Sequence, residues 1–295
     1  MKLALNGATI MRSPLADDVE IAASCGFAAL EVWAGKLGPY LEQRSLAGLR
    51  ASMQALGIAA SCINSIEDIT FRDAEGRAAL RRDVAEMAAT ARAIGAPAIV
   101  VVPGRRPEGS SRSASIREAV ASLRVMSDIS GDVALAFEFL GKPGSCVPTL
   151  DMANEIIGQV DRPNVGMVVD TFHFYAGGSR IEDLRHALLD RLLVVHLNGC
   201  EDRPRGELAD EHRLYPGEGV IPIRSILATL RERAYDGTFS VEMFRPQYWE
   251  QDARIVARTA FERAWAVLAN AGYARGFSRA ENGGARAAPG AEAQD

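Results

Sequence analysis

The sequence has no long run of apolar residues, and this absence argues against a membrane protein. No stretch approaches the roughly 20 consecutive apolar residues that a membrane-spanning helix requires. The apolar start of the chain is interrupted by Asn6 and Gly7, so it is also shorter than the core of a signal peptide. We therefore expect no membrane partner and a cytoplasmic protein.

Cysteine is scarce as well, and its spacing argues against a disulfide-stapled or thiolate-bound fold. The four cysteines lie far apart and form no CxxC pair, which is the spacing typical of zinc-thiolate sites. Reduced thiols that pack as small apolar side chains are favoured over a zinc site or a disulfide framework. This expectation concerns Cys25, Cys62, Cys146 and Cys200.

Positive charge is neither abundant nor concentrated. The 33 lysines and arginines are outnumbered by 38 aspartates and glutamates, which leaves a formal net charge of -5. Binding to nucleic acid depends on a basic surface that neutralises phosphates. Because no basic stripe runs along the chain, we expect no nucleic-acid partner.

What the sequence does contain is a regular alternation of short apolar runs and longer amphipathic runs. Short apolar runs are typical of parallel strands that are buried on both faces. The expected strands are residues 3–10, 28–33, 58–64, 98–103, 133–140, 165–170, 192–198 and 238–244. The expected helices lie near residues 16–25, 43–56, 76–95, 113–130, 149–160, 180–190, 222–233 and 249–271.

These strand–helix units indicate a fold of the α/β class in which helices cover a parallel sheet. An open doubly wound sheet shows the same alternation, but the G-x-G-x-x-G fingerprint of dinucleotide folds is missing after the first strand. The number of units and the length of 295 residues favour a single (β/α)8 TIM barrel over residues 1–275. Residues 276–295 are small, polar and aperiodic, and we expect a disordered tail there.

One ionisable side chain closes each of the last four expected strands: Glu138, Asp170, His196 and Glu242. The carboxyl ends of the strands form the active-site face of such a barrel, so these side chains should meet. A single acid there is more often a salt bridge or a helix cap, but several buried together repel one another unless neutralised. The pattern therefore predicts one divalent metal ion per chain. The carboxylates favour Mn²⁺ or Mg²⁺, while the histidine keeps Zn²⁺ and Co²⁺ as alternatives.

Further side chains near the strand ends are candidates for substrate contacts. His173 lies three residues beyond Asp170 and is expected to reach a bound substrate, with a loop histidine bonded to backbone as the alternative. Trp33 ends the second strand, where it would form an apolar wall for a sugar ring or simply pack at the rim. Arg203 and Arg245 follow the last two strands, where they would bind substrate oxygens, anchor carboxylates or serve on the surface.

Several of these segments resemble one known family. Residues 164–179 (NVGMVVDTFHFYAGGS), 215–219 (YPGEG) and 241–248 (VEMFRPQY) are the most characteristic, and residues 138–143 and 1–6 also match. They are similar to the xylose-isomerase-like TIM barrel superfamily of sugar isomerases and epimerases, and within it to the inosose isomerase (2-keto-myo-inositol isomerase) group. The resemblance covers roughly residues 1–272.

The resemblance implies roles for residues already singled out. His173 falls on the substrate-contacting histidine of the family's D-x-x-H motif, and Asn6 belongs with the expected substrate contacts. A homo-oligomer is also expected, because members of this kind often form dimers or tetramers. The family's metal-ligand positions correspond to Glu138, Asp170, His196 and Glu242.

The resemblance also implies a reaction on a small ketopolyol or ketosugar. A carbonyl and a hydroxyl would exchange places through an ene-diolate, with Glu138 and Glu242 as catalytic base and acid and His173 polarising a substrate oxygen. A ketose 3-epimerase or a ketosugar dehydratase would use the same intermediate, while a non-catalytic sugar-binding subunit and a metal-dependent endonuclease are less favoured. Gly7 and the run Leu197-Asn198-Gly199 depart from the group's pattern, and both loops are expected to face the substrate.

Overall fold

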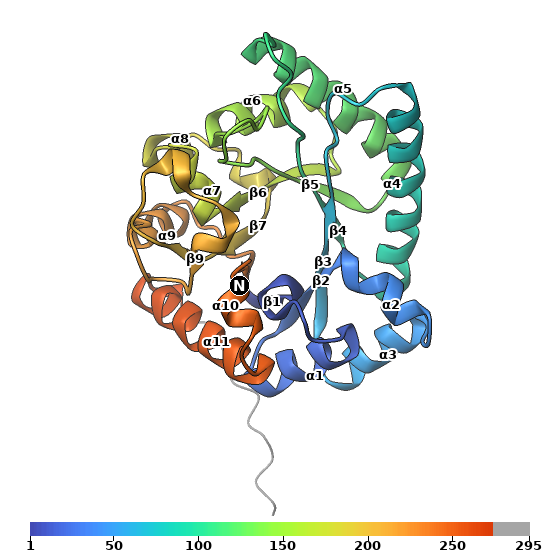
Figure 1. Cartoon of the computed structure of the whole chain (residues 1–295), viewed down its shortest axis with the longest axis vertical. Helices are drawn as coiled ribbons and strands as arrows, with labels where there is room; N and C mark the ends of the chain where they lie inside the picture. Colours follow the sequence, from blue (N-terminus) through green and yellow to red (C-terminus); the bar gives the residue numbers. More distant parts are fainter. Residues whose placement is uncertain (274–295) are drawn as a thin grey trace, which may run out of the picture.

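The computed structural model describes residues 1–273, so the tail expected over 276–295 lies outside the described residues. Within the described part, eight parallel strands form a closed barrel (Figure 1), in which the first strand pairs with both the second and the last. This closure confirms the expected TIM barrel and excludes the open doubly wound sheet. The barrel strands are β1 (Lys2–Asn6), β2 (Ala29–Trp33), β3 (Ala59–Ile66), β4 (Ala98–Val101), β5 (Ala134–Glu138), β6 (Val165–Asp170), β7 (Leu192–Leu197) and β10 (Thr238–Val241).

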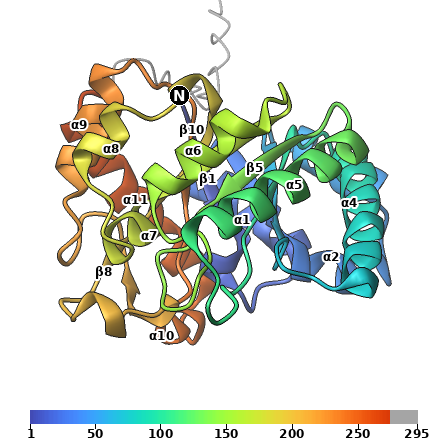
Figure 2. The same ribbon diagram turned by 90° about the horizontal axis from the view of Figure 1, so that it is seen from above.

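A ring of helices surrounds the barrel, as both views show (Figures 1 and 2). Ser45 and Asp73 begin two of these helices, and the side chain of each accepts a hydrogen bond from a backbone N–H of the first turn. The outer helices are α1 (Leu15–Cys25), α3 (Leu46–Ala55), α4 (Ala74–Ile94), α5 (Arg112–Ser130), α6 (Leu150–Val160), α8 (Ile181–Arg185), α9 (Ile223–Glu232) and α11 (Ala253–Asn270).

The strands alternate between side chains that face the helices and side chains that face the barrel axis. A small apolar cluster, separate from the main core, fills the barrel interior and includes Ala136, Val168 and Val194. The residues two places further along these strands therefore face the same interior at its carboxyl end. They are Glu138, Asp170 and His196.

The first expected strand is shorter in the structure than residues 3–10. β1 ends at Asn6, and residues 7–10 form a turn of 3-10 helix. The side-chain oxygen of Asn6 accepts a hydrogen bond from the backbone N–H of Ala8 at 2.8 Å, which caps this helix. The apolar residues that suggest a longer strand are buried in the helical conformation instead.

The helices expected over 180–190 and 249–271 also differ in extent. The first of them is shorter, and Arg233 donates hydrogen bonds to the carbonyls of Leu184 (3.2 Å) and Ala187 (2.7 Å) at its end. The second begins at Ala253 rather than at residue 249. The elements without a sequence prediction of their own are α2 (Leu37–Leu41), α7 (Thr171–Ala176), β8 (Gly199–Cys200), β9 (Arg213–Leu214) and α10 (Pro246–Trp249).

The β7–α9 segment, residues 198–222, is the longest excursion at the carboxyl end of the barrel and carries the β8–β9 pair. In Figure 2 this pair and α10 lie at the end of the barrel opposite the N-terminus. Arg245 holds the segment in place, since its Nη1 donates to Oε1 of Glu201 at 2.8 Å and to the backbone carbonyl of Arg213 at 3.4 Å. The segment is thereby fixed over the strand ends.

The fold bears on the expectations for the cysteines and for membrane-spanning helices. All four cysteines are free and buried, as expected of small apolar side chains. Among residues 1–273, no helix has the length and apolar character required to cross a membrane.

A buried lysine, Lys36, stabilises the turn after β1 through hydrogen bonds. Lys36 donates from Nζ to the carbonyls of Gly7 (3.0 Å) and Ile10 (2.9 Å) and to Oδ2 of Asp18 (2.7 Å). We expect Lys36→Met to lower the free energy of unfolding by about 3–5 kcal/mol, because it leaves a buried carboxylate and two carbonyls without a donor.

This loss should depend on pH. Burial raises the pKa of Asp18 to about 7 although Lys36 opposes the shift. A raised pKa in the folded state gives stability that is present below the unfolded pKa of about 4 and is lost as the pH rises through about 7. Removing Lys36 raises this pKa further, so urea midpoints of Lys36→Met should fall short of wild type by more at pH 8 than at pH 5.5. An equal deficit at both pH values would contradict this account.

Candidate metal and substrate site

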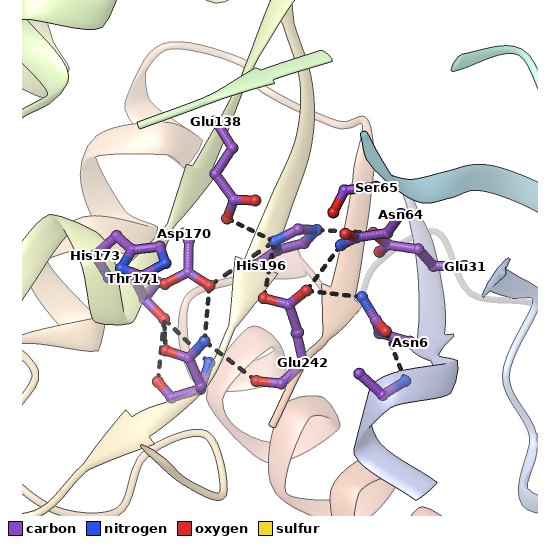
Figure 3. A network of polar contacts seen from close by, with 12 residues as sticks. Asn6, Glu31, Asn64, Ser65, Glu138, Asp170, Thr171, His173, His196 and Glu242 are labelled. Atoms are coloured by element: carbon purple, nitrogen blue, oxygen red, sulfur yellow. Dashed lines mark hydrogen bonds and ion pairs between the residues drawn. The ribbon is translucent and has the colours of Figure 1, made fainter. Parts of the chain in front are cut away.

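The four expected ligand side chains meet at the carboxyl end of the barrel. Glu138, Asp170, His196 and Glu242 are all buried, and each offers one ligand atom, with these atoms within 4.8 Å of one another. Figure 3 shows the three carboxylates around one ring nitrogen of His196. This nitrogen, Nδ1, lies 3.0 Å from Oε1 of Glu138, 3.2 Å from Oε2 of Glu242 and 3.8 Å from Oδ2 of Asp170.

The electrostatics of this cluster are those of a cation site. Burial, together with the charges of Glu242 and Asp170, raises the pKa of Glu138 to about 8, against the opposing effect of His196. Burial also raises the pKa of Glu242. Both shifts mean that the carboxylates resist being charged together. A divalent cation would remove that resistance, and three carboxylates with one imidazole suit Mn²⁺, Mg²⁺, Zn²⁺ or Co²⁺.

A buried arginine, which sequence reasoning missed, completes the cluster. Arg213 on β9 is 1% exposed and donates from Nη1 to Oδ2 of Asp170 at 2.6 Å and to Oε2 of Glu242 at 3.0 Å. Its Nη2 donates to Oδ1 of Asp210 at 2.8 Å. Although burial opposes ionisation, Arg213 is the main reason that the pKa of Asp170 is held well below its usual range. No sequence pattern marks Arg213, because it lies on the short strand β9 between β7 and α9 rather than at the end of a barrel strand.

The hydrogen bond of His173 determines which of its nitrogens is free. Its Nε2 lies 3.2 Å from Nη2 of Arg213, and since a guanidinium only donates, Nε2 accepts and the proton is on Nδ1. Burial lowers the pKa of His173 to about 4, so the ring is neutral at pH 7. Within residues 1–273 the buried Nδ1 has no hydrogen-bond partner. His173 therefore has a buried N–H donor without a hydrogen-bond partner, although other atoms of the residue line the cavity.

Asn6 was expected to contact the substrate, and the structure directs it to a candidate ligand. Its Nδ2 donates to Oε1 of Glu242 at 2.9 Å, while its oxygen caps the 3-10 helix. Asn64, which carries the same signal of a polar residue after an apolar strand, donates to the same oxygen at 2.8 Å. Both asparagines therefore orient the Glu242 carboxylate.

Asn198 lies in a loop that was expected to face the substrate, but its own side chain is directed elsewhere. The residue is fully buried, and its Nδ2 donates to Oδ2 of Asp170 at 3.0 Å while its Oδ1 accepts from the Thr171 hydroxyl at 2.8 Å. Asn198 thus orients the carboxylate of Asp170, a candidate ligand. At Gly7, a Cβ atom would lie 3.1 Å from Oδ2 of Asp18 and 3.2 Å from Cβ of Trp33, so this turn has no room for a side chain without rearrangement.

A cavity of about 150 Å³ opens beside the cluster and contains two of the expected substrate contacts, His173 and Trp33. The Trp33 ring packs edge-to-face on Phe244 with centroids 5.3 Å apart. Neither Arg203 nor Arg245 belongs to the lining. The lining residues are Trp33, Asn64, Ser65, Glu67, Val102, Glu138, Leu140, Lys142, His173, Asp210, Arg213, Glu242 and Phe244.

The two arginines outside the cavity have other partners. Arg203 is about half exposed and forms an ion pair with Glu201 at 2.8 Å. Arg245 pairs with the same carboxylate and holds the β7–α9 segment. Since that segment carries Arg213, Arg245 influences the site through position rather than through contact.

A family model, a curated protein and a solved structure are all similar to most of this chain. The family model described as "Xylose isomerase-like TIM barrel" matches residues 19–261. The chain is 36% identical to the inosose isomerase of Halalkalibacterium halodurans over 88% of this chain and 94% of that one. The crystal structure of the IOLI protein with a binding zinc atom is similar with a TM-score of 0.89 and 33% identity, covering 92% of this chain and 99% of that chain.

A shorter similarity extends to an epimerase. The chain is 29% identical to the D-psicose 3-epimerase of Enterocloster bolteae over 129 residues, which is 43% of this chain and 39% of that one. Isomerases and an epimerase are thus found among proteins similar to this barrel.

Proposed function

Because this chain belongs to the xylose isomerase-like TIM barrel family and is an isomerase, we propose that it interconverts ketopolyols, with an inosose such as 2-keto-myo-inositol as the substrate. The reaction moves a carbonyl and a hydroxyl between neighbouring carbons through an ene-diolate. The observation that carries this proposal is the convergence of Glu138 and Glu242, from either side of β6 and β7, on one point beside the cavity.

We further propose that one divalent metal ion is held by the four clustered side chains. When bound, it would supply Lewis-acid stabilisation of the negative charge that develops on the substrate oxygens. The set fits Mn²⁺ or Mg²⁺ by its carboxylates, and Zn²⁺ or Co²⁺ by its imidazole. The proposed ligands are Glu138, Asp170, His196 and Glu242.

The chain's own side chains transfer the protons and contact the substrate. Of Glu138 and Glu242, one removes the carbon-bound proton and the other returns a proton to the neighbouring carbon. His173, which lines the cavity, polarises a substrate oxygen, and Arg213 holds the ring through Nε2. Trp33 offers an apolar face to the carbon skeleton of the ring.

The test is a panel assay in D₂O that is followed by proton NMR. The Mn²⁺-loaded protein is offered keto-inositols, ketohexoses and 3-keto-sugars, and we expect deuterium incorporation with a shifted carbonyl on an inosose. Inversion at one carbon of a ketohexose would instead favour a 3-epimerase, the alternative supported by the shorter similarity. Absence of exchange on every ketopolyol would refute an isomerase of this substrate class.

Removal of the metal gives a separate prediction. Dialysis against a chelator should reduce turnover of the inosose to background, because the negative charge that develops on the substrate oxygens then has no Lewis acid to stabilise it. Metal analysis before dialysis should give one ion per chain, and addition of Mn²⁺ should restore turnover. Full turnover in protein shown by elemental analysis to contain no metal would contradict the proposed site.

A further inference from the structure

Glu31 lies on the opposite side of His196 from the proposed ligands (Figure 3). Its Oε1 is 3.1 Å from Nε2 of His196, whereas Nδ1 of the same ring faces Glu138 and Glu242. Glu31 and His196 are both fully buried at the carboxyl ends of β2 and β7. The two nitrogens of this ring therefore have distinct environments.

A neutral imidazole carries one proton, and the partner of one nitrogen determines which nitrogen has the free lone pair. A carboxylate only accepts hydrogen bonds. Carboxylates lie at both nitrogens of the metal-free ring. A cation in the cluster would displace a proton from Nδ1 alone, and Glu31 would accept the hydrogen bond of the proton that stays on Nε2. With an amide or no partner in this place, the ring would be free to bind a proton on Nδ1, the nitrogen that a metal ion requires.

Asn64 connects Glu31 to a second proposed ligand. Its Nδ2 donates to Oε1 of Glu31 at 2.8 Å and to Oε1 of Glu242 at 2.8 Å. One amide group thus ties together a carboxylate that orients His196 and a carboxylate of the cluster. Asn64 on β3 thereby links Glu31 on β2 to Glu242, which directly follows β10.

We propose that Glu31 is a positioning residue that commits Nδ1 of His196 to the metal ion and, through Asn64, holds the carboxylate of Glu242. This inference rests on the proposed metal site. It assigns Glu31 no contact with substrate, and it concerns the affinity of the site and the choice of ligand atom rather than the chemical step.

The test compares Glu31→Gln with wild type in zinc affinity, measured by competition with a chromophoric chelator. Partners of this kind that orient a ligand are associated with about 10–100-fold in metal affinity, and we expect a loss in that range. Glu118→Gln is the matched control, because it makes the same change on the outer helix α5, where Oε1 accepts from the backbone N–H of Phe71 at 2.9 Å. The control should bind zinc as wild type does.

A second readout separates positioning from general stability. In zinc-loaded protein with ¹⁵N-labelled histidine, wild type should show His196 with a proton on Nε2 and zinc on Nδ1. We expect Glu31→Gln to lose that pattern at an unchanged melting temperature, and Glu31→Asp, which keeps the charge but withdraws the oxygen, to weaken zinc binding as well. Wild-type zinc affinity and an unchanged His196 pattern in Glu31→Gln would overturn the role of Glu31 alone. Failure of wild type itself to bind zinc would overturn the proposed metal site and this inference with it.

Discussion

Replacing Glu242 with Gln should abolish the exchange of the substrate's carbon-bound proton with solvent deuterium. An amide cannot accept that proton, and general acid–base catalysis alone contributes about 10²–10⁴-fold to a rate. The substitution also removes one charge from the proposed ligand set. The amide oxygen can still accept from Asn6 and Asn64, so the fold should be retained. The measurement is the loss of the substrate proton signal in D₂O.

The amide nitrogen of the variant would face the Arg213 guanidinium, which is also a donor, so the metal content must be measured alongside the exchange. Oε2 of Glu242 now accepts from Nη1 of Arg213 at 3.0 Å and lies 3.2 Å from Nδ1 of His196. Elemental analysis of Glu242→Gln measures the metal content. A variant that keeps its metal but does not exchange the proton has lost the proton-transferring group, whereas a variant without metal has lost the ion. Glu118→Gln again serves as the control and should exchange normally. Normal exchange in Glu242→Gln would remove this glutamate from the reaction.

Replacing Arg213 with Met should lower the free energy of unfolding of the metal-free protein by about 3–5 kcal/mol, the range for breaking a buried ion pair. The loss arises because Asp170 and Glu242 remain buried without the cation that both now contact. Methionine keeps apolar contact with the rings of Phe172 and Phe244, over which the guanidinium lies at 4.8 Å and 5.3 Å. Urea denaturation in a chelator measures the difference.

The same variant should behave differently when metal is bound. A divalent cation would neutralise the carboxylates that Arg213 now partners, so the deficit of Arg213→Met should shrink when Mn²⁺ is present. Arg213→Lys, which keeps the charge but lacks the fork that contacts two carboxylates, should fall between wild type and Met. A variant as stable as wild type in the chelator would show that Arg213 does not stabilise the cluster.

The site residues at the ends of barrel strands could be predicted from the sequence, whereas Arg213 could not. Glu138, Asp170 and His196 could be predicted because each follows an apolar run with the period of two that directs side chains into a barrel. Glu31 and Asn64 carry the same signal at strands two and three, and an extension of that reasoning would have included them. Arg213 carries no such signal, because it lies outside the barrel strands, in the β7–α9 segment, whose path is decided by tertiary contacts.

What the sequence determined by itself was the barrel, the strand ends and the four side chains expected at one metal ion. These features follow from local periodicity, which repeats along the chain and is readable without knowledge of contacts. The tertiary structure alone decided that Arg213 lies among those carboxylates, that Asn198 supports Asp170 from behind, and that Arg245 holds a segment in place. The physical reason is that each of these contacts joins residues on separate elements, whose distance is fixed only when the barrel closes.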